Sequence, residues 1–158
     1  MAKEFEVLDL NVAVVLIVND GKILAVFNEK WGAYTLPMTK RQEWPKPGRE
    51  EGMIAEDWVD AAIRARAEWV RGTSRDSPTF VTELPEYQQS DRDGQWKRYE
   101  FHVFRLDLVN LDLILSDKVD WLTPAEFLDL DRRPLSKTAR DIVSGVQAAT
   151  QLHNKPFP

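Results

Sequence analysis

Two apolar runs near the start of the chain predict a β-hairpin. The first run extends from Val12 to Val18 and is mostly β-branched, and the second occupies residues 22–27. Asn19-Asp20-Gly21 separates the two runs, and an Asp-Gly pair in this setting is a strong short-range signal for a tight turn. The first run does not alternate with polar residues, so we expect a strand that is buried on both faces.

Residues 31–37 predict a short strand or an extended loop that ends at Pro37. Residues 40–55 follow, and we expect no regular structure in them, because charges dominate and turn-forming residues break the segment. Those residues are Pro45, Pro47, Gly48 and Gly52. Two interpretations stay open for this insertion loop, a surface excursion or a lip that binds a partner.

A helix is predicted from about Asp57, because acidic residues in a first turn complement the helix dipole, and Gly72 is a typical stop. Apolar residues at helical spacing predict its buried face. These residues are Val59, Ile63, Ala67 and Val70, with Ala62 beside them.

Two strands follow, over residues 79–84 and 98–108, with Asp93-Gly94 marking a turn between them. On the second strand the alternation places three residues on one face, Tyr99, Phe101 and Val103. The other face receives His102, Phe104 and Leu106.

A short strand at residues 120–122 runs into a helix start in which Thr123 caps, Pro124 takes the first position and Glu126 completes a capping box. Ser136 is predicted to cap a last helix. The apolar face of that helix is Ala139, Ile142, Val143, Val146 and Ala149.

The order of elements predicts an α+β fold, a mixed β-sheet packed between helices, in a single domain of 158 residues. We expect a core over about residues 10–150 and a loose tail at 153–158.

The net charge of −5 argues against binding of nucleic acid or an anionic membrane surface. The longest apolar run is too short to cross a membrane. With no cysteine and no apolar leader, the cytoplasm is the expected compartment.

The segment from Glu56 to Gly72 carries a family resemblance. Glu56, seven residues and then Arg64 resemble the middle of the Nudix box, G-x5-E-x7-R-E-U-x-E-E-x-G-U, where U is bulky and apolar. Residues 36–40 (LPMTK) resemble the L-P-G-G-K segment of these MutT-like proteins with both glycines replaced. Residues 121–127 resemble their late W-(V/L)-(S/T)-x-x-E-(L/F) turn, and residues 135–140 the start of their closing helix. The likeness covers roughly residues 10–146 and implies a Nudix-like fold.

The box is degenerate after Arg64. Members of the family cleave a nucleoside diphosphate linked to another group by attack of water on phosphorus, with divalent metals held by helical glutamates. Counted from Arg64, Ala65 and Trp69 replace two of those glutamates and Glu68 is kept. Counted back from Gly72, even Glu68 leaves the pattern. Both helix registers stay open, and both lose at least two of the three acids.

Candidate site residues follow from the resemblance. Glu68 and Glu56 are the candidates for catalysis and for binding Mg²⁺ or Mn²⁺, if the protein is an active hydrolase; otherwise no cofactor is expected. Arg64, Arg66 and Lys40 are the candidates for binding a ligand phosphate. Glu50, Glu51 and Asp57 are the acids that would add oxygens to a rescued metal site. Glu56 also has a structural interpretation, an ion pair with Arg64 that fixes the loop on the helix.

The charges along the helix admit a simpler interpretation. Asp60, Arg64, Glu68 and Arg71 alternate in sign at spacings of four, four and three residues. A solvated face with salt bridges explains this ladder better than a metal site does.

The favoured functional hypothesis is a Nudix-fold protein that binds a nucleotide-like or phosphorylated ligand, or a protein partner such as a second copy, without ordinary Mg²⁺-dependent pyrophosphohydrolysis. A divergent but active Nudix hydrolase is the alternative, and a structural module without a ligand is a third hypothesis. Trp31 and Trp44 are candidates for stacking on a ring. His102 and Glu100 are interpreted as packed and surface-facing residues, and His153 as part of the tail.

Overall fold

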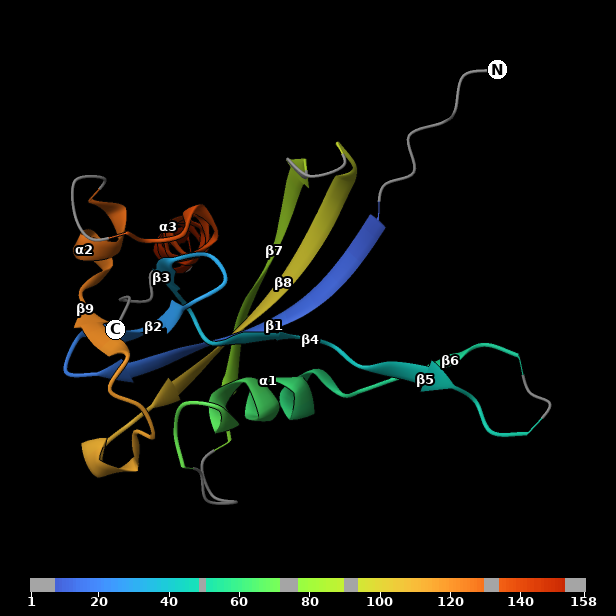
Figure 1. Ribbon diagram of the computed structural model, residues 1–158, viewed down its shortest axis with the longest axis horizontal. Helices are drawn as coiled ribbons and strands as arrows, with labels where there is room; N and C mark the ends of the chain where they lie inside the picture. Colours follow the sequence, from blue (N-terminus) through green and yellow to red (C-terminus); the bar gives the residue numbers. More distant parts are fainter. Residues whose placement is uncertain (1–7, 49–50, 72–76, 90–93, 130–133, 153–158) are drawn as a thin grey trace.

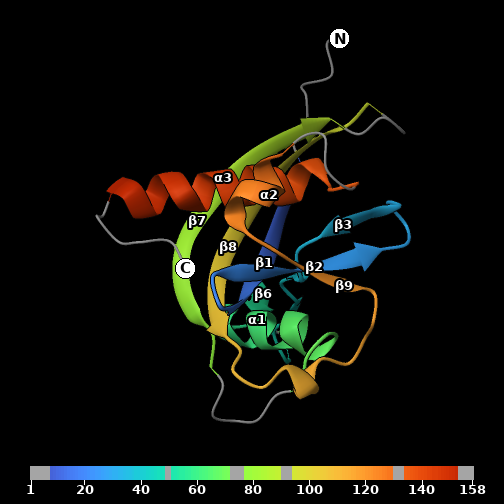
Figure 2. The same cartoon turned by 90° about the vertical axis from the view of Figure 1, so that its left-hand side faces the viewer.

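The computed structural model describes residues 8–48, 51–71, 77–89, 94–129 and 134–152. Within these ranges a seven-stranded mixed sheet lies between helices on both faces, as the two views in Figures 1 and 2 show. The strands of this sheet are β1 (Leu8–Asn19), β2 (Lys22–Asn28), β3 (Ala33–Thr35), β4 (Met38–Lys40), β7 (Thr79–Gln89), β8 (Trp96–Asp107) and β9 (Val119–Leu122). A separate two-stranded sheet contains β5 (Glu43–Pro45) and β6 (Met53–Ala55). The helices are α1 (Trp58–Ala67), α2 (Pro124–Leu128), α3 (Lys137–Leu152) and the short 3-10 helix η1 (Leu111–Leu113). The predicted α+β class is confirmed.

Strand β1 is central and organises the sheet. It pairs in parallel with β8 and antiparallel with β2 and β4. The predicted hairpin between β1 and β2 is confirmed, and its two turn residues have positive φ angles, 50° at Asp20 and 73° at Gly21. A two-residue turn with positive φ at both positions matches the right-handed twist of the strands that it joins.

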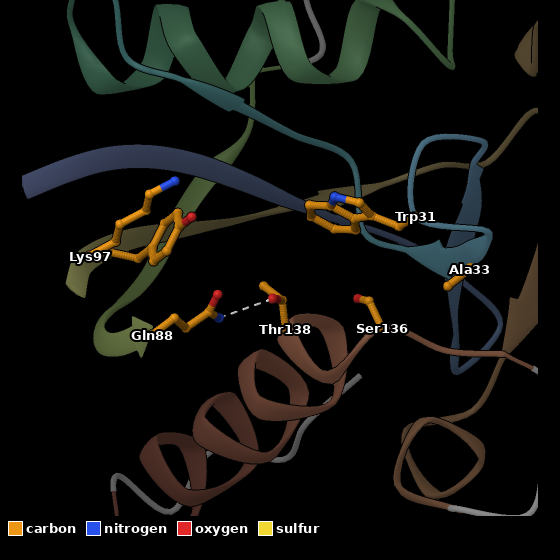
Figure 3. A pocket seen from close by; sticks show the side chains of 7 residues that line it. Trp31, Ala33, Gln88, Lys97, Ser136 and Thr138 are labelled. Atoms are coloured by element: carbon orange, nitrogen blue, oxygen red, sulfur yellow. Dashed lines mark hydrogen bonds between the residues drawn. The ribbon is translucent and has the colours of Figure 1, made fainter. Parts of the chain in front are cut away.

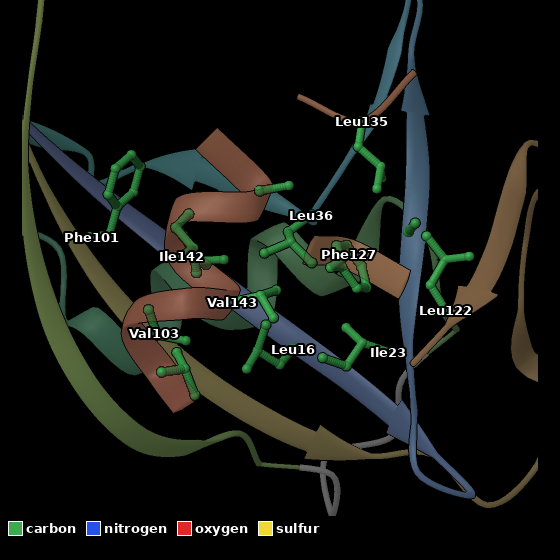
Figure 4. Packing of buried hydrophobic residues seen from close by; sticks show 14 of the residues in the cluster. Leu16, Ile23, Leu36, Phe101, Val103, Leu122, Phe127, Leu135, Ile142 and Val143 are labelled. Atoms are coloured by element: carbon green, nitrogen blue, oxygen red, sulfur yellow. The ribbon is translucent and has the colours of Figure 1, made fainter. Parts of the chain in front are cut away.

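Alternate side chains of β1 enter two separate cores, so the predicted burial on both faces is confirmed. One core lies under α2 and α3 and receives Val12, Val14, Leu16 and Val18 from β1; part of it is drawn in Figure 4. The other core lies under α1 and receives Ala13, Val15 and Ile17. Strand β8 divides in the same way, with Phe101 and Val103 in the first core and Phe104 and Leu106 in the second.

The predicted buried face of α1 is confirmed for Ala62 and for Val70, which follows the helix, and is wrong for Val59 and Ala67. The residues that the helix buries are Ala61, Ala62, Ala65 and Arg66, whereas Ala67 is exposed and Val59 retains 39% exposure. Alanines on the sheet side allow the helix backbone to lie close to β1, and the ion pair between Glu56 and Arg64 fixes the rotation of the helix. The prediction relied on the spacing of the larger apolar residues and missed Ala61 and Ala65, which complete the buried stripe with Ala62. The predicted start is confirmed, because Asp57 is the N-cap.

The expectation of no regular structure at residues 40–55 is also wrong, because β5 and β6 form an antiparallel ribbon that projects from the body of the molecule (Figure 1). Trp44 lies opposite Ile54, and Pro45 lies opposite Met53. Three of the turn-forming residues lie between the two strands, namely Pro47, Gly48 and Gly52, and the two glycines adopt φ angles of 76° and 107°. Pro45 is tolerated because a two-stranded ribbon has only edges.

The predictions for the second half of the chain agree better with the structure. Strands β7 and β8 pair antiparallel, although β7 continues to Gln89, five residues beyond the predicted end. The capping box of α2 is present with Thr123, Pro124 and Glu126 in their predicted roles. Ser136 Oγ accepts a hydrogen bond from Ala139 N at 3.0 Å at the start of α3. Among the described residues, no helix is long and apolar enough to cross a membrane.

Some predicted features lie outside the described residues. They are Glu50, Gly72, Asp93 and the tail 153–158, which includes His153.

Candidate functional site

Glu56 and Arg64 form the predicted ion pair. Arg64 Nε donates to Glu56 Oε2 at 2.8 Å and Arg64 Nη2 donates to Glu56 Oε1 at 2.8 Å, a two-pronged contact. Gln42 N donates to the same Oε1 at 3.1 Å. Glu56 is 8% exposed, and the hydrogen bond from Arg64 holds the pKa of its carboxyl below the ordinary value. Both oxygens therefore have structural hydrogen bonds.

The same arginine anchors the segment before the helix. Arg64 Nη2 donates to the carbonyl oxygen of Lys40 at 2.9 Å, and Arg64 Nη1 lies 3.4 Å from Thr39 Oγ1. Arg41 Nε donates to the carbonyl oxygen of Glu56. Glu56, Arg64 and Lys40 are thus brought together, with Lys40 taking part through its backbone.

The helix itself offers one carboxylate at the box positions. Glu68 is the C-cap of α1 and is exposed. Ala65 is fully buried, and Trp69 is half-buried against the core under α1. Among the described residues, no group of three or more acidic, histidine or cysteine ligands includes Glu68. A hard cation such as Mg²⁺ requires clustered oxygens, so the residues present on α1 do not fit the metal that the family resemblance implies.

Arg66 lies apart from the other predicted phosphate ligands. It is 6% exposed and lines a small hollow with Val70, Leu106 and Leu108. Lys40 lies toward the other end of the sheet, where it pairs with Val12. The structure therefore does not bring Arg66 and Lys40 to one site.

A larger pocket opens on the α3 face of the sheet, and we call it the Trp31 pocket. Its volume is about 340 Å³, and Figure 3 shows the residues that line it. They are Trp31, Ala33, Gln88, Lys97, Tyr99, Ser136 and Thr138. An adjoining hollow of about 270 Å³ shares Trp31, Gln88, Tyr99 and Thr138 and extends the pocket to Val12, Asn28, Met38, Thr39, Lys40 and Phe101.

Each wall of the Trp31 pocket comes from a different element. Trp31 is held in the β2–β3 loop, where its backbone N donates to Asn28 Oδ1 at 3.1 Å, and its side chain is 52% exposed. Tyr99 projects from β8 and stacks on Phe101, with ring centroids 5.5 Å apart. Gln88 Nε2 on β7 donates to Thr138 Oγ1 on α3 at 3.2 Å and closes the side between sheet and helix (Figure 3).

Sequence reasoning found two residues of this pocket, Trp31 and Lys40, and missed the rest. The predicted alternation along β8 already placed Tyr99 and Phe101 on one face, and the same period of two would have added Lys97 to that face. Gln88, Ser136 and Thr138 gave no signal, because their approach depends on the β7–β8 register and on where α3 lies.

The sequence matches no protein-family model and no curated protein. Solved structures do resemble the fold. The E. coli ORF135 protein is 16% identical with a TM-score of 0.59, covering 96% of each chain. The C. elegans Ap4A hydrolase is 18% identical with a TM-score of 0.52, covering 94% of this chain and 99% of that one.

Shewanella oneidensis NrtR, crystallised with a 27mer DNA, is 16% identical with a TM-score of 0.53, and the match covers 90% of this chain and 62% of NrtR. Several other similar structures are Nudix or MutT proteins, such as a NUDIX hydrolase from Nitrosomonas europaea. Identities this low show the fold alone. The chain has a Nudix-like fold, as its sequence predicted.

Proposed function

We propose that this protein binds a nucleotide-like or phosphorylated ligand in the Trp31 pocket and does not carry out ordinary Mg²⁺-dependent pyrophosphohydrolysis. The observation that carries the proposal is the combination of an exposed indole, Trp31, and a partly buried phenol, Tyr99, with one lysine in the pocket and a second in its adjoining hollow. A planar base with an attached phosphate is a chemistry that matches both features.

The aromatic part of the pocket favours a flat ring. Trp31 presents an exposed indole (Figure 3). Tyr99, which stacks on Phe101, contributes a phenol ring to the lining of the same pocket. Aromatic pairs of this kind stabilise by about 0.5–1.5 kcal/mol beyond the area that they bury. The hydroxyls of Ser136 and Thr138 and the amide of Gln88 supply hydrogen-bonding groups at the edge of such a ring.

The cationic part favours a phosphate. Lys97 lines the pocket and Lys40 lines its adjoining hollow. Among the described residues, neither lysine is in an ion pair with a carboxylate, so both ammonium groups are available to an anionic ligand. An ammonium group serves as a point charge for phosphate.

The box helix supports binding without hydrolysis. Glu56 is occupied by Arg64 and Gln42, Ala65 is buried, and Glu68 is a lone exposed carboxylate. Mg²⁺ requires near-ideal octahedral geometry, and one exposed carboxylate fixes neither the position of the ion nor the directions of its other ligands. We further propose that the protein acts in the cytoplasm and that nucleic acid is not its partner, because a net charge of −5 argues against broad nucleic-acid binding.

Calorimetric titration with a panel of nucleoside mono- and diphosphates, in EDTA and then in Mg²⁺, tests the proposal. We expect binding in EDTA that weakens at least about tenfold in Trp31→Ala and in Lys97→Ala. Trp44→Ala is the matched control, because this second exposed tryptophan lies on the β5–β6 ribbon and its loss leaves the pocket intact. Release of product from any member of the panel, dependent on Mg²⁺ and abolished by Glu68→Gln, would establish the hydrolase alternative instead.

A further inference from the structure

A second group of polar side chains lies on the face of β8 opposite to the Trp31 pocket. Tyr99 and Phe101 point toward α3, so Glu100 and His102, which alternate with them, point toward α1. On the adjacent strand Glu83 lies directly across from His102 in the antiparallel register. Directly opposed residues of paired strands share a face, as do residues two apart on one strand, so the sheet itself gathers Glu83, Glu100 and His102. We call this group the His102 site.

The His102 site has the spacing of metal ligands. One ligand atom from each of the three side chains lies within 4.8 Å of the other two. His102 Nε2 lies 3.3 Å from Glu83 Oε1. Two donors that each lie about 2.0–2.2 Å from a shared cation in tetrahedral geometry are about 3.3–3.5 Å apart, so this pair already has the required separation.

The imidazole of His102 is held in place by a stacked indole. Trp58, the first residue of α1, stacks on His102 with ring centroids 3.6 Å apart and planes 6° from parallel. The side chain of His102 is 15% exposed, and the indole fixes its plane so that Nε2 faces Glu83. A ring fixed in this way loses little conformational entropy when it binds a cation.

We infer that Glu83, Glu100 and His102 bind a divalent transition-metal cation, with Zn²⁺ as the preferred ion. One imidazole nitrogen and two carboxylate oxygens suit Zn²⁺, which accepts nitrogen and oxygen ligands in tetrahedral sites and leaves its fourth position to water. Mg²⁺ is disfavoured, because it prefers oxygen ligands in octahedral geometry and retains several waters.

Two arginines lie near the His102 site and hold its surrounding groups in place. Arg98 Nη2 lies 2.8 Å from Glu100 Oε1, which leaves the second oxygen of Glu100 for the cation and orients the carboxylate as an outer partner does. Arg41 lies over the ring of Trp58, 4.7 Å from its centroid. The bound ion would link β7 to β8. It would also hold His102 against Trp58, the first residue of α1. The site lies across the sheet from the Trp31 pocket and does not rest on the proposed function.

The test uses the full chain, tag-free and stripped with EDTA. Calorimetric titration with Zn²⁺, Mn²⁺ and Mg²⁺ measures affinity, and long-range ¹H–¹⁵N spectra follow the imidazoles. The chain has two histidines, His102 and His153, so the His153→Gln variant assigns both sets of resonances. We expect one equivalent of Zn²⁺ to bind, to shift the His102 resonances and to leave those of His153 in place.

The variants locate the ligands. His102→Gln and Glu83→Gln each weaken Zn²⁺ binding at least about tenfold. Glu83 is 51% exposed, so its variant is the one least able to disturb folding. Glu68→Gln is the control on the box helix and leaves the Zn²⁺ affinity unchanged. Zn²⁺ binding that is absent, that shifts His153 alone, or that survives Glu83→Gln undiminished would overturn the assignment.

Discussion

Glu86 on β7 and Asp141 on α3 form a carboxyl pair that should make the stability of this fold depend on pH. Burial, together with a hydrogen bond to Asp141 and the charge of that residue, raises the pKa of Glu86 to about 7. The hydrogen bond from Glu86 holds the pKa of Asp141 below its ordinary value. At acidic pH the protonated Glu86 therefore donates to an ionised Asp141, which Lys137 also contacts at 2.7 Å.

The direction of the pH dependence follows from the two pKa shifts. The folded pKa of Glu86 lies above the ordinary value of 4.5, so its contribution to stability is complete below about pH 4.5 and is lost as pH rises through about 7. Asp141 acts in the opposite direction and only in the acid range, where its lowered pKa contributes stability that is lost as pH falls. The Glu86 shift corresponds to at most about 3 kcal/mol at 1.36 kcal/mol per pKa unit, and solvent at this sheet edge reduces the expected loss to about 1–2 kcal/mol.

Glu86→Gln isolates the contribution of Glu86 ionisation to stability, because glutamine keeps the shape and a hydrogen-bond donor but cannot ionise. Urea unfolding at pH 5, 6, 7 and 8 should give nearly equal stabilities at pH 5. At pH 8 the variant should be more stable than the unmodified protein by about 1–2 kcal/mol. Glu51→Gln, at an exposed position beside the ribbon, is the control and should give a difference that does not change with pH. A Glu86→Gln difference that is constant over this range, or that favours the variant at pH 5, would refute the reasoning.

Three further predictions concern the box helix and the ribbon. Glu56→Ala should lower the free energy of unfolding, measured in urea, by about 2–3 kcal/mol. This loss is smaller than for a fully buried ion pair, because the side chain of Arg64 is 37% exposed. A loss below about 0.5 kcal/mol would contradict the structural role of the pair. Ala65→Glu, which restores a box acid at a fully buried position, should cost at least about 3 kcal/mol. Ala67→Glu, at an exposed position of the same helix, should cost less than about 0.5 kcal/mol, and equal costs would contradict the orientation of α1. Amides of β5 and β6 should exchange with deuterium at least about 100-fold faster than those of β1, because an isolated two-stranded ribbon is marginally stable; equal protection would show that the ribbon is covered.

The sequence predicted those parts of the fold that local patterns determine. The β1–β2 hairpin follows from an Asp-Gly turn between two apolar runs, and the α2 capping box follows from Thr123 and Glu126. The buried face of α1 followed only in part, because Ala61 and Ala65 carry a weak hydrophobic signal although small side chains allow the closest packing. The ribbon at 43–55 was missed because its prolines and glycines suggested an absence of regular structure, whereas Pro47, Gly48 and Gly52 lie in the connection between two short strands and Pro45 ends the first of them.

The same distinction applies to the candidate sites: local patterns predicted some of their residues and not others. The pair Glu56–Arg64 was predicted because one sequence pattern spans both residues. The Trp31 pocket and the His102 site depend on residues such as Gln88, Lys97 and Glu83, which meet only through the register of β7 against β8. That register depends on contacts between segments far apart in the chain, and no local pattern encodes it.

A single ³¹P NMR experiment tests the central claim most directly, that the Trp31 pocket binds a nucleotide-like ligand and leaves its diphosphate bond intact. The protein is mixed with a nucleoside diphosphate linked to a second group, first in EDTA and then in excess Mg²⁺, and spectra are recorded over several hours. We predict that the two diphosphate resonances shift or broaden in EDTA, that Trp31→Ala abolishes the effect, and that Mg²⁺ produces no new phosphomonoester resonance. A phosphomonoester signal that grows after Mg²⁺ is added and is absent in Glu68→Gln would contradict the account, as would unchanged diphosphate resonances with every ligand of the panel.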